Sequence, residues 1–521
     1  MYADGIRLGQ CGVLTGRFAI HLDAIMVAIS RVAYRRGSDY LGLTVIRQFL
    51  VQHGLQPWPP ETGVDKQPDQ INLLLKTAAN LPWSLVLASG SYIPVFDLGY
   101  VDYAATAFRL FGLRIEALYY LYFAILGISS AAFCIAFYEN PAAICSLAMM
   151  LLTLRWLKRH LTIFDESKMN YVYSYHFLST LTVVPGFHVI LSVLSLQDLG
   201  WAAIATGAIQ IYVAYRSLRI RYGASWVLFA TAAATLSVLV LHSDRIGRLT
   251  QVLAALLSGS MPVHDLSGGQ LLSELAAGLS GVWLVGALVL CFVGLSWGYK
   301  RRLSPVYGTD EVIDHYPRYH GAYLGLTMDA DTWKGNMQDG QFDHPQDLNG
   351  IFAAKYWLLS TPGAGVAFPQ LKPELSAYHS NLWDFRWRTY EQIIRLAFFD
   401  YVRKNWQSLP RLYAICKPHA LLTALAEALS AVFRGLRRDQ PFESVLMATV
   451  ASIATGIAYT SYASGPVAAA ILWIMLAAPA PQIWAYTIRH SLADQLWVAF
   501  FAPWLLLLWI IASGVQAVSG L

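Results

Sequence analysis

Hydrophobic residues gather along this chain in long runs that are separated by two more polar stretches. The runs are long enough to cross a bilayer as helices, which takes roughly 17–25 residues. They occupy residues 117–137, 141–157, 177–196, 199–215, 224–242, 276–298, 443–461, 464–488 and 493–518. Residues 18–34 form a weaker run, interrupted by His21, Asp23 and Arg31, that is either a first span or an amphipathic surface helix. The pattern predicts a polytopic α-helical membrane protein with about 9–11 transmembrane helices.

The polar stretches divide the chain into four regions. Residues 35–95 mix prolines, among them Pro57, Pro59, Pro60 and Pro68, with polar residues, which indicates an extramembrane loop with short helices. Residues 299–442 are rich in His, Asp, Trp, Pro and Gly, and their second half is amphipathic and helical in pattern. We therefore expect an N-terminal region with a weak span and a loop (1–116), a bundle of about six transmembrane helices (117–298), an inserted soluble, mainly helical domain (299–442) and C-terminal transmembrane helices (443–521).

Composition agrees with the membrane class and excludes several others. Hydrophobic residues make up 56% of the 521 positions and charged residues only 13%, against about 25% charged in soluble domains. The net charge of +5 includes no long basic run, so we expect no nucleic-acid partner. The five cysteines lack metal-ligand spacing, so neither a disulfide framework nor a zinc site is expected.

The number of spans constrains which loops share a face of the membrane. Six runs lie between Asp97 and Lys300, an even number, so the Asp97 loop and the soluble domain are expected on the same side. The loops at 158–175 and 216–223 share that side and are more basic than the opposite loops. The positive-inside rule alone makes this side cytoplasmic, unless the cations there bind an anionic ligand.

Two carboxylates open the segment FDLGYVDYAATAFRLFG (96–112), whose apolar residues recur at helical spacing. The spacing predicts an amphipathic helix along the membrane interface. Asp97, at the junction of loop and helix, is either an N-cap or a general base that takes a proton from an acceptor hydroxyl. Asp102 is either the partner of Arg109 in an ion pair or a second candidate base.

Other polar residues could bind a substrate or have structural roles. Lys158 and Arg159 could hold a lipid phosphate, or they could anchor a helix end by snorkelling. Tyr319 and His320 could bind a sugar or phosphate oxygen, although a single His is more often structural. The Asp-x-Asp of MDADTW (328–333) could hold a divalent cation, but nothing else in the sequence supports a metal, and a solvated loop is the simpler interpretation. We expect no cofactor.

Several segments resemble one enzyme family. The first loop and following run, FDLGYVDYAATAFRLFG and LRIEALYYLYFAILGISSAAFCIAFYENP, resemble the first loop and second span of GT-C type membrane glycosyltransferases and their bacterial relatives. Three segments of the polar region resemble blocks in the soluble part of some relatives: YPRYHGAYLGL (316–326), PGAGVAFP (362–369) and TYEQIIRLAFFDYVRKN (389–405). The weak run at 18–34 departs from the strong first span of that family.

This resemblance implies an enzyme of the bacterial inner membrane that transfers a sugar from a polyprenyl-phosphate donor to a periplasmic or lipid-linked acceptor. Asp97 is the position that matches the catalytic base of the family, with Asp102 in reserve, and the soluble domain then lies in the periplasm. The implied partners are membrane lipids and the polyprenyl-phosphate sugar, and a membrane protein complex is the expected partner of an assembly subunit.

Two other functional classes remain open. A non-catalytic membrane scaffold or assembly subunit could keep a GT-C-like fold, because a fold does not guarantee an activity. A transporter is the third class, but the spans lack the buried charges expected along an ion pathway.

Overall fold

The computed structural model describes fewer than half of the residues, and these are helical or in short turns. The described residues are 28–29, 31–32, 72, 75–76, 79, 98–160, 177–195, 201–220, 225–241, 286, 289–301, 318–326, 354, 357–358, 360–362, 387–419 and 466–477. No strand occurs among them. The expectation of a mainly helical chain is therefore confirmed for this part of the sequence.

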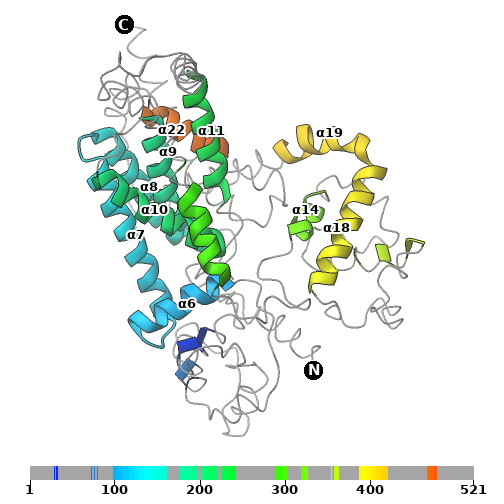
Figure 1. The fold of residues 1–521 in the computed structure, drawn as a ribbon, viewed down its shortest axis with the longest axis horizontal. Helices are drawn as coiled ribbons and strands as arrows, with labels where there is room; N and C mark the ends of the chain where they lie inside the picture. Colours follow the sequence, from blue (N-terminus) through cyan, green and yellow to red (C-terminus); the bar gives the residue numbers. More distant parts are fainter. Residues whose placement is uncertain are drawn as a thin grey trace, which may run out of the picture.

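The first group of helices forms a bundle, with α6 crossing one end of it (Figure 1). Its members are α6 (Leu98–Phe111), α7 (Glu116–Ala136), α8 (Pro141–His160), the 3₁₀ helix η6 (Phe177–Thr182), α9 (Val183–Leu194), α10 (Trp201–Ile220), α11 (Trp226–Leu241) and α22 (Pro466–Ala477). A further helix covers residues 289–301. α7, α8, α9, α10 and α11 lie at the apolar runs 117–137, 141–157, 177–196, 199–215 and 224–242.

The turn between α6 and α7 is fixed at both sides by local hydrogen bonds. Gly112 adopts a positive φ of 87°, which glycine tolerates without strain, and its N–H donates to the Phe108 carbonyl at 3.0 Å. Asn72 then caps the start of α7: its side-chain oxygen accepts the N–H of Ile115 at 2.7 Å, and its amide donates to Glu116 at 3.1 Å. The chain therefore reverses sharply at this end of the bundle.

The core of the bundle is centred on α9, whose residues from Val183 to Val193 are all buried. Among the residues that the structure describes, Trp226 of α11 is the largest fully buried side chain. Its indole N–H donates to the Thr182 hydroxyl at 3.0 Å, and its ring lies so close to Gly186 that a Cβ there would overlap it. This close approach joins α9 to α11.

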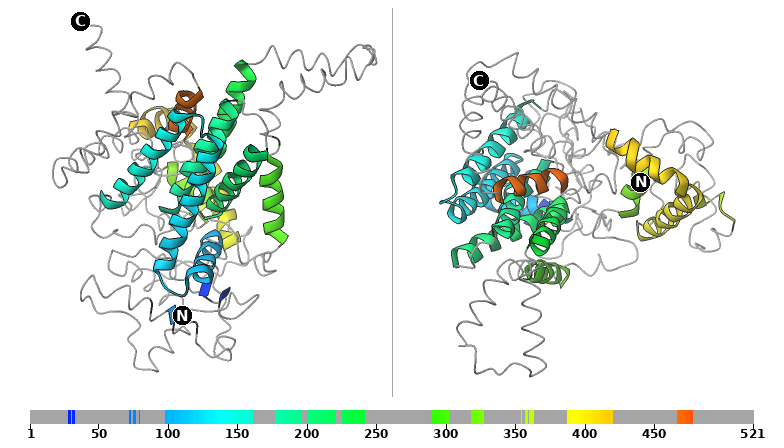
Figure 2. Two further views of the ribbon diagram at one scale, coloured as in Figure 1. Left: turned by 90° about the vertical axis from the view of Figure 1, so that its left-hand side faces the viewer. Right: turned by 90° about the horizontal axis from the view of Figure 1, so that it is seen from above.

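The C-terminal helix α22 belongs to the same core. Val467, Ala470 and Ile474 are buried in the hydrophobic cluster that contains α9 and α11, and α22 packs against both helices (Figure 2). We expected the soluble domain to separate two groups of spans. The described part of the C-terminal region therefore packs with the first group of helices, although residues 299–442 lie between them in the sequence.

By length and composition, one helix of the described residues could cross a membrane. This is α7, Glu116–Ala136, while Thr180–Leu194 and Trp226–Leu236 are apolar but shorter. The described helices lie at the positions of the predicted apolar runs, but most of them do not meet this length and composition test. The number of membrane crossings stays a prediction.

A second, smaller group of helices has its own core, which we call the α14–α18 unit. It comprises α14 (Arg318–Leu326), α18 (Trp387–Lys404), the 3₁₀ helix η10 (Trp406–Ser408), α19 (Leu409–Arg411) and the π-helix η11 (Leu412–Cys416). Tyr323, Tyr390, Ile394 and Tyr401 are among the buried residues of this core. The amphipathic helical second half expected for residues 299–442 is confirmed at α18.

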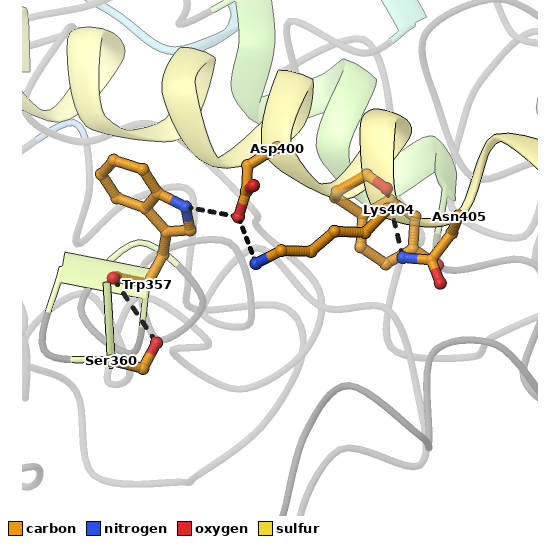
Figure 3. A network of polar contacts seen from close by, with 6 residues as sticks. Trp357, Ser360, Asp400, Lys404 and Asn405 are labelled. Carbon is orange, nitrogen blue, oxygen red and sulfur yellow. Dashed lines mark hydrogen bonds and ion pairs between the residues drawn. The ribbon is translucent and has the colours of Figure 1, made fainter. Parts of the chain in front are cut away.

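Asp400 of α18 ties the unit together on its surface (Figure 3). Its Oδ2 accepts the indole N–H of Trp357 at 3.1 Å and the ammonium of Lys404 at 2.7 Å. Asn405 ends the helix, its side-chain amide donating to the Tyr401 carbonyl at 3.1 Å. The Asp400 carboxylate therefore links residue 357 to α18 across 43 positions of sequence.

Lys417, just after the π-helix, is a buried cation. Its side chain is 0% exposed, and its ammonium lies 4.4 Å from the ring centroid of Tyr413. Burial lowers the pKa of Lys417 to about 7, because desolvation disfavours the charged form. Between about pH 7 and about pH 10 the unfolded chain therefore binds a proton that the folded chain does not. The free energy of unfolding should rise with pH across this window, since stability rises wherever the unfolded state binds more protons.

Replacing Lys417 by methionine is expected to raise the free energy of unfolding at pH 7 by ~1–3 kcal/mol, because a buried amine is exchanged for an apolar side chain of similar length. The substitution should also abolish the rise in stability between about pH 7 and about pH 10. Urea unfolding of the full chain in detergent at several pH values measures both effects. Lys404→Met is the matched control, since the Lys404 side chain is 64% exposed. An unchanged pH dependence in Lys417→Met would contradict the assignment.

Candidate functional site

The start of α6 lies in very close contact with the end of α10. A Cβ on Gly99 would overlap the backbone carbonyl group of Arg219 and the nitrogen of Ile220, so only glycine fits between the two helices. Asp97, the predicted general base, comes two residues earlier and lies outside the described residues. The contact nevertheless brings the first turn of α6 beside the cationic end of α10.

Asp102 forms an ion pair with Arg31. The Arg31 Nη1 donates to Asp102 Oδ1 at 2.8 Å, with the two side chains 21% and 24% exposed. Arg109 binds elsewhere: its Nη2 donates to the backbone carbonyl of Arg31 at 3.1 Å. Our expectation that Asp102 pairs with Arg109 is therefore wrong. Seven residues of helix separate the two side chains by roughly 10 Å along the axis, whereas direct helical neighbours are three or four residues apart.

Arg219 and Tyr299 complete a group of charged and polar side chains at this end of the bundle. The Arg219 guanidinium lies over the Tyr299 ring, 3.8 Å from its centroid. Tyr299 in turn lies within electrostatic range of Asp102, Arg219 and Arg31. We call Arg31, Asp102, Arg219 and Tyr299 the α6 charge cluster. With two guanidinium groups and one carboxylate, these four side chains carry a net positive charge, which favours an anionic ligand such as a phosphate.

A double-mutant cycle on Arg31 and Asp102 tests the correction of the ion pair. We expect a coupling energy of about 1 kcal/mol between Arg31→Ala and Asp102→Ala, in the upper range for a partly exposed pair. The matched cycle on Asp102 and Arg109 should give a coupling near zero. Thermal unfolding of the full chain in detergent measures both cycles, and a larger coupling for Arg109 would reverse the assignment.

Lys158 and Arg159 lie in the last turn of α8, which ends at His160. Their side chains lie outside what the structure describes, so their proposed contact with a lipid phosphate stays a prediction. The same holds for the Asp-x-Asp segment at 328–333, which the described residues do not include.

Tyr319 and His320 lie together on α14 and face α18. His320 is 4% exposed, and its Nδ1 lies 2.5 Å from the Tyr390 hydroxyl. The backbone N–H of Tyr319 donates to Glu391 at 3.3 Å, and the Tyr319 ring lies 5.7 Å from the Arg395 guanidinium. These contacts give His320 a structural role inside the α14–α18 unit. A role in binding a sugar or phosphate stays a prediction.

A second polar group, which the sequence analysis missed, is buried in the bundle. The Ser129 hydroxyl donates to Gln210 Oε1 at 2.5 Å, and Gln210 Nε2 donates to the Ser129 carbonyl at 2.7 Å. The same Nε2 lies 3.4 Å from His188 Nδ1. His188 and Gln210 are isolated polar residues within apolar runs. This isolation was the sequence feature that could have indicated a buried polar group. Their hydrogen bonds join α7, α9 and α10.

Among the residues that the structure describes, no group of three or more His, Cys, Asp or Glu side chains is placed to hold a metal ion. Comparison of the chain with protein-family models, with curated proteins and with solved structures finds no match. The resemblance to the GT-C family therefore depends on the quoted segments alone. Any functional assignment has to be argued from the residues and their contacts.

Proposed function

We propose that this chain is a multi-span membrane glycosyltransferase of GT-C type, which transfers a sugar from a polyprenyl-phosphate donor to a periplasmic or lipid-linked acceptor. The observation that carries the proposal is the α6 charge cluster. It contains Arg31, which pairs with Asp102 in the second turn of α6, and Arg219, whose backbone contacts Gly99 in the first turn, two residues after Asp97 in the chain. A carboxylate base and a cationic phosphate site are the two groups that this chemistry requires.

The outer surface of the bundle supports its placement in a bilayer. α7, α10, α11 and the helix at 289–301 all carry large exposed apolar side chains, among them Ile128, Ile204, Leu236 and Leu290. Leu290 is 73% exposed. Contiguous apolar patches larger than a few hundred Å² are rare on soluble monomers, so several helices with large exposed apolar side chains support a bilayer environment. Lipid tails would cover it, and a lipid-linked donor could then enter the site laterally from the membrane.

The proposed reaction assigns different roles to the two carboxylates. The oxygen of the acceptor hydroxyl attacks the anomeric carbon of the donor sugar, and its proton passes to the Asp97 carboxylate. The bond between the anomeric carbon and the phosphate oxygen breaks, and polyprenyl phosphate leaves. Arg31 and Arg219 stabilise the negative charge of the leaving phosphate. Asp102, ion-paired with Arg31, positions that guanidinium, so we propose it as a positioning residue and no longer as a second base.

The direct test is the release of polyprenyl phosphate, because this product forms whichever sugar is transferred. The full chain in lipid nanodiscs is incubated with a panel of synthetic polyprenyl-phosphate hexoses and pentoses, together with membrane extract as the source of acceptor. We expect release with at least one donor, and weaker donor binding in Arg219→Met. Absence of both donor binding and release across the panel would contradict the proposal.

The second candidate function is a non-catalytic scaffold or assembly subunit in a membrane complex. It is favoured by the finding that Asp102 and His320, two of the predicted site residues, both have structural partners in Arg31 and Tyr390. Purification of the chain from native membranes in mild detergent distinguishes the two functions. Stable recovery in a larger complex without any donor binding would support the scaffold.

A further inference from the structure

α18 has one buried face and one exposed face. Ile393, Ile394, Ala397 and Tyr401 pack into the core of the α14–α18 unit. The opposite side exposes Arg395, Leu396, Phe399 and Arg403, which lie on one face because they are one, four and eight positions apart. Trp406 follows directly after the helix and is also exposed. We call these five residues the outer face of α18.

The exposed charged side chains on this part of the surface are cations. The exposed residues between 391 and 419 include Arg395, Arg403, Lys404 and Arg411, and none of them is acidic. The two acidic residues of this stretch, Glu391 and Asp400, are only partly exposed. Glu391 accepts the Tyr319 N–H, and Asp400 accepts Trp357 and Lys404. The surface around the outer face of α18 is therefore complementary to an anionic partner.

The apolar residues of the same surface distinguish between two anionic partners, a lipid surface and a nucleic acid. Leu396 is 44% exposed, Phe399 50% and Trp406 62%, and Ile415 on the following π-helix is 62% exposed. Trp, Phe and Leu beside Arg and Lys are the residues of helices that lie in the membrane interface. A nucleic acid would use the cations and aromatic rings but leave Leu396 and Ile415 exposed to water, because aliphatic side chains do not stack on bases. An anionic lipid surface accommodates both kinds of side chain.

We propose that the outer face of α18 lies on the anionic surface of the bilayer that holds the bundle. Phe399, Leu396 and Trp406 enter the boundary between headgroups and acyl chains, and Arg395 and Arg403 bind lipid phosphates. α7 would anchor the chain in this bilayer, since it is long and apolar enough to cross one. The proposal requires the bundle to be in a membrane, but it does not depend on the transferase activity.

The test places an environment-sensitive fluorophore at position 399. Intrinsic fluorescence cannot report on Trp406 alone, because the chain contains 17 Trp. Phe399→Cys is labelled with a nitrobenzoxadiazole probe in a full-length chain whose five cysteines are replaced by serine. The chain is reconstituted in nanodiscs of phosphatidylcholine with and without phosphatidylglycerol. Lys404→Cys is the matched control, because position 404 is exposed on the same helix but lies about 140° away from position 399 around the axis.

We expect the probe at position 399 to shift to the blue and to be quenched by nitroxide lipids in the anionic nanodiscs. The probe at position 404 should stay accessible to aqueous iodide. Arg395→Gln and Arg403→Gln should each lower the equilibrium constant for docking of α18 on the anionic lipid surface by about five-fold for the one cation lost, measured as the fraction of the probe at position 399 that is protected from iodide. Full iodide access to position 399 in both lipid mixtures would overturn the proposal.

A photo-crosslinking measurement keeps the proposal testable if the serine-substituted chain does not fold. p-Benzoylphenylalanine replaces Phe399 in the otherwise natural chain, and nanodiscs and native membranes that contain this variant are both irradiated before intact-mass analysis. A phospholipid adduct supports the proposal. A covalent dimer of the chain, or an adduct with another protein in native membranes, would assign the outer face of α18 to a protein partner and overturn it.

Discussion

Replacing Gly99 by alanine is expected to destabilise the bundle by about 2–3 kcal/mol, at the upper end of what one added methyl group costs in a packed interior. The new Cβ would overlap backbone atoms of Arg219 and Ile220, and backbone cannot rotate away as a flexible side chain can. Alanine gains only about 0.5–1 kcal/mol over glycine through helix propensity. The steric cost is therefore larger, and α6 must move away from α10.

Thermal unfolding of the full chain in detergent measures this effect. Gly127→Ala is the matched control, since Gly127 lies in α7 and a Cβ there meets nothing within 4 Å. That control should be neutral or slightly stabilising. If Gly99→Ala were as stable as Gly127→Ala, the close packing of α6 on α10 would be wrong, and Arg219 would no longer be placed beside the first turn of α6.

Asp97→Asn is expected to lower the rate of sugar transfer by about 10²–10⁴-fold, the usual contribution of a general base. Asparagine has nearly the same shape as aspartate but cannot accept the proton of the acceptor hydroxyl at neutral pH. An asparagine side chain is also a good N-cap, so the start of α6 should be preserved. Donor binding should therefore stay close to that of the unsubstituted chain, while release of polyprenyl phosphate is lost.

Asp102→Asn separates the two carboxylates. It weakens the ion pair with Arg31 without removing the proposed base, so we expect weaker donor binding and only a small loss in the maximal rate of transfer. If Asp102→Asn abolished transfer while Asp97→Asn transferred normally, the roles of the two residues would have to be exchanged. Wild-type rates in both variants would leave the scaffold as the better assignment.

The positions of most described helices could be predicted because hydrophobic pattern is a local property. The apolar run at 117–137 became α7, Glu116–Ala136, and the run at 199–215 became α10, Trp201–Ile220. The helical spacing in the segment 96–112 likewise located α6. We expected α6 to lie along the membrane interface with one apolar face buried. In the structure Tyr100 and Tyr103 are buried as well as that face, so the burial of α6 extends beyond the predicted apolar residues.

The contacts between distant segments could not be predicted from pattern. Arg31 and Asp102 are 71 residues apart, and the sequence offered the nearer Arg109 as a partner. Gly99 carried no local signal either, because its need for glycine comes from the backbone of α10. Tyr390, the partner of His320, lies 70 residues away. Such pairs depend on how helices cross, which the periodicity of one segment does not specify.

The inclusion of α22 in the bundle has a consequence for how the protein is made. More than two hundred residues separate the end of α11 from the start of α22, and ribosomes add about 5–20 residues per second. α22 is therefore synthesised on the order of 10–50 s after α11. During that interval the surfaces of α9 and α11 that α22 contacts lack the cover that it provides in the folded chain.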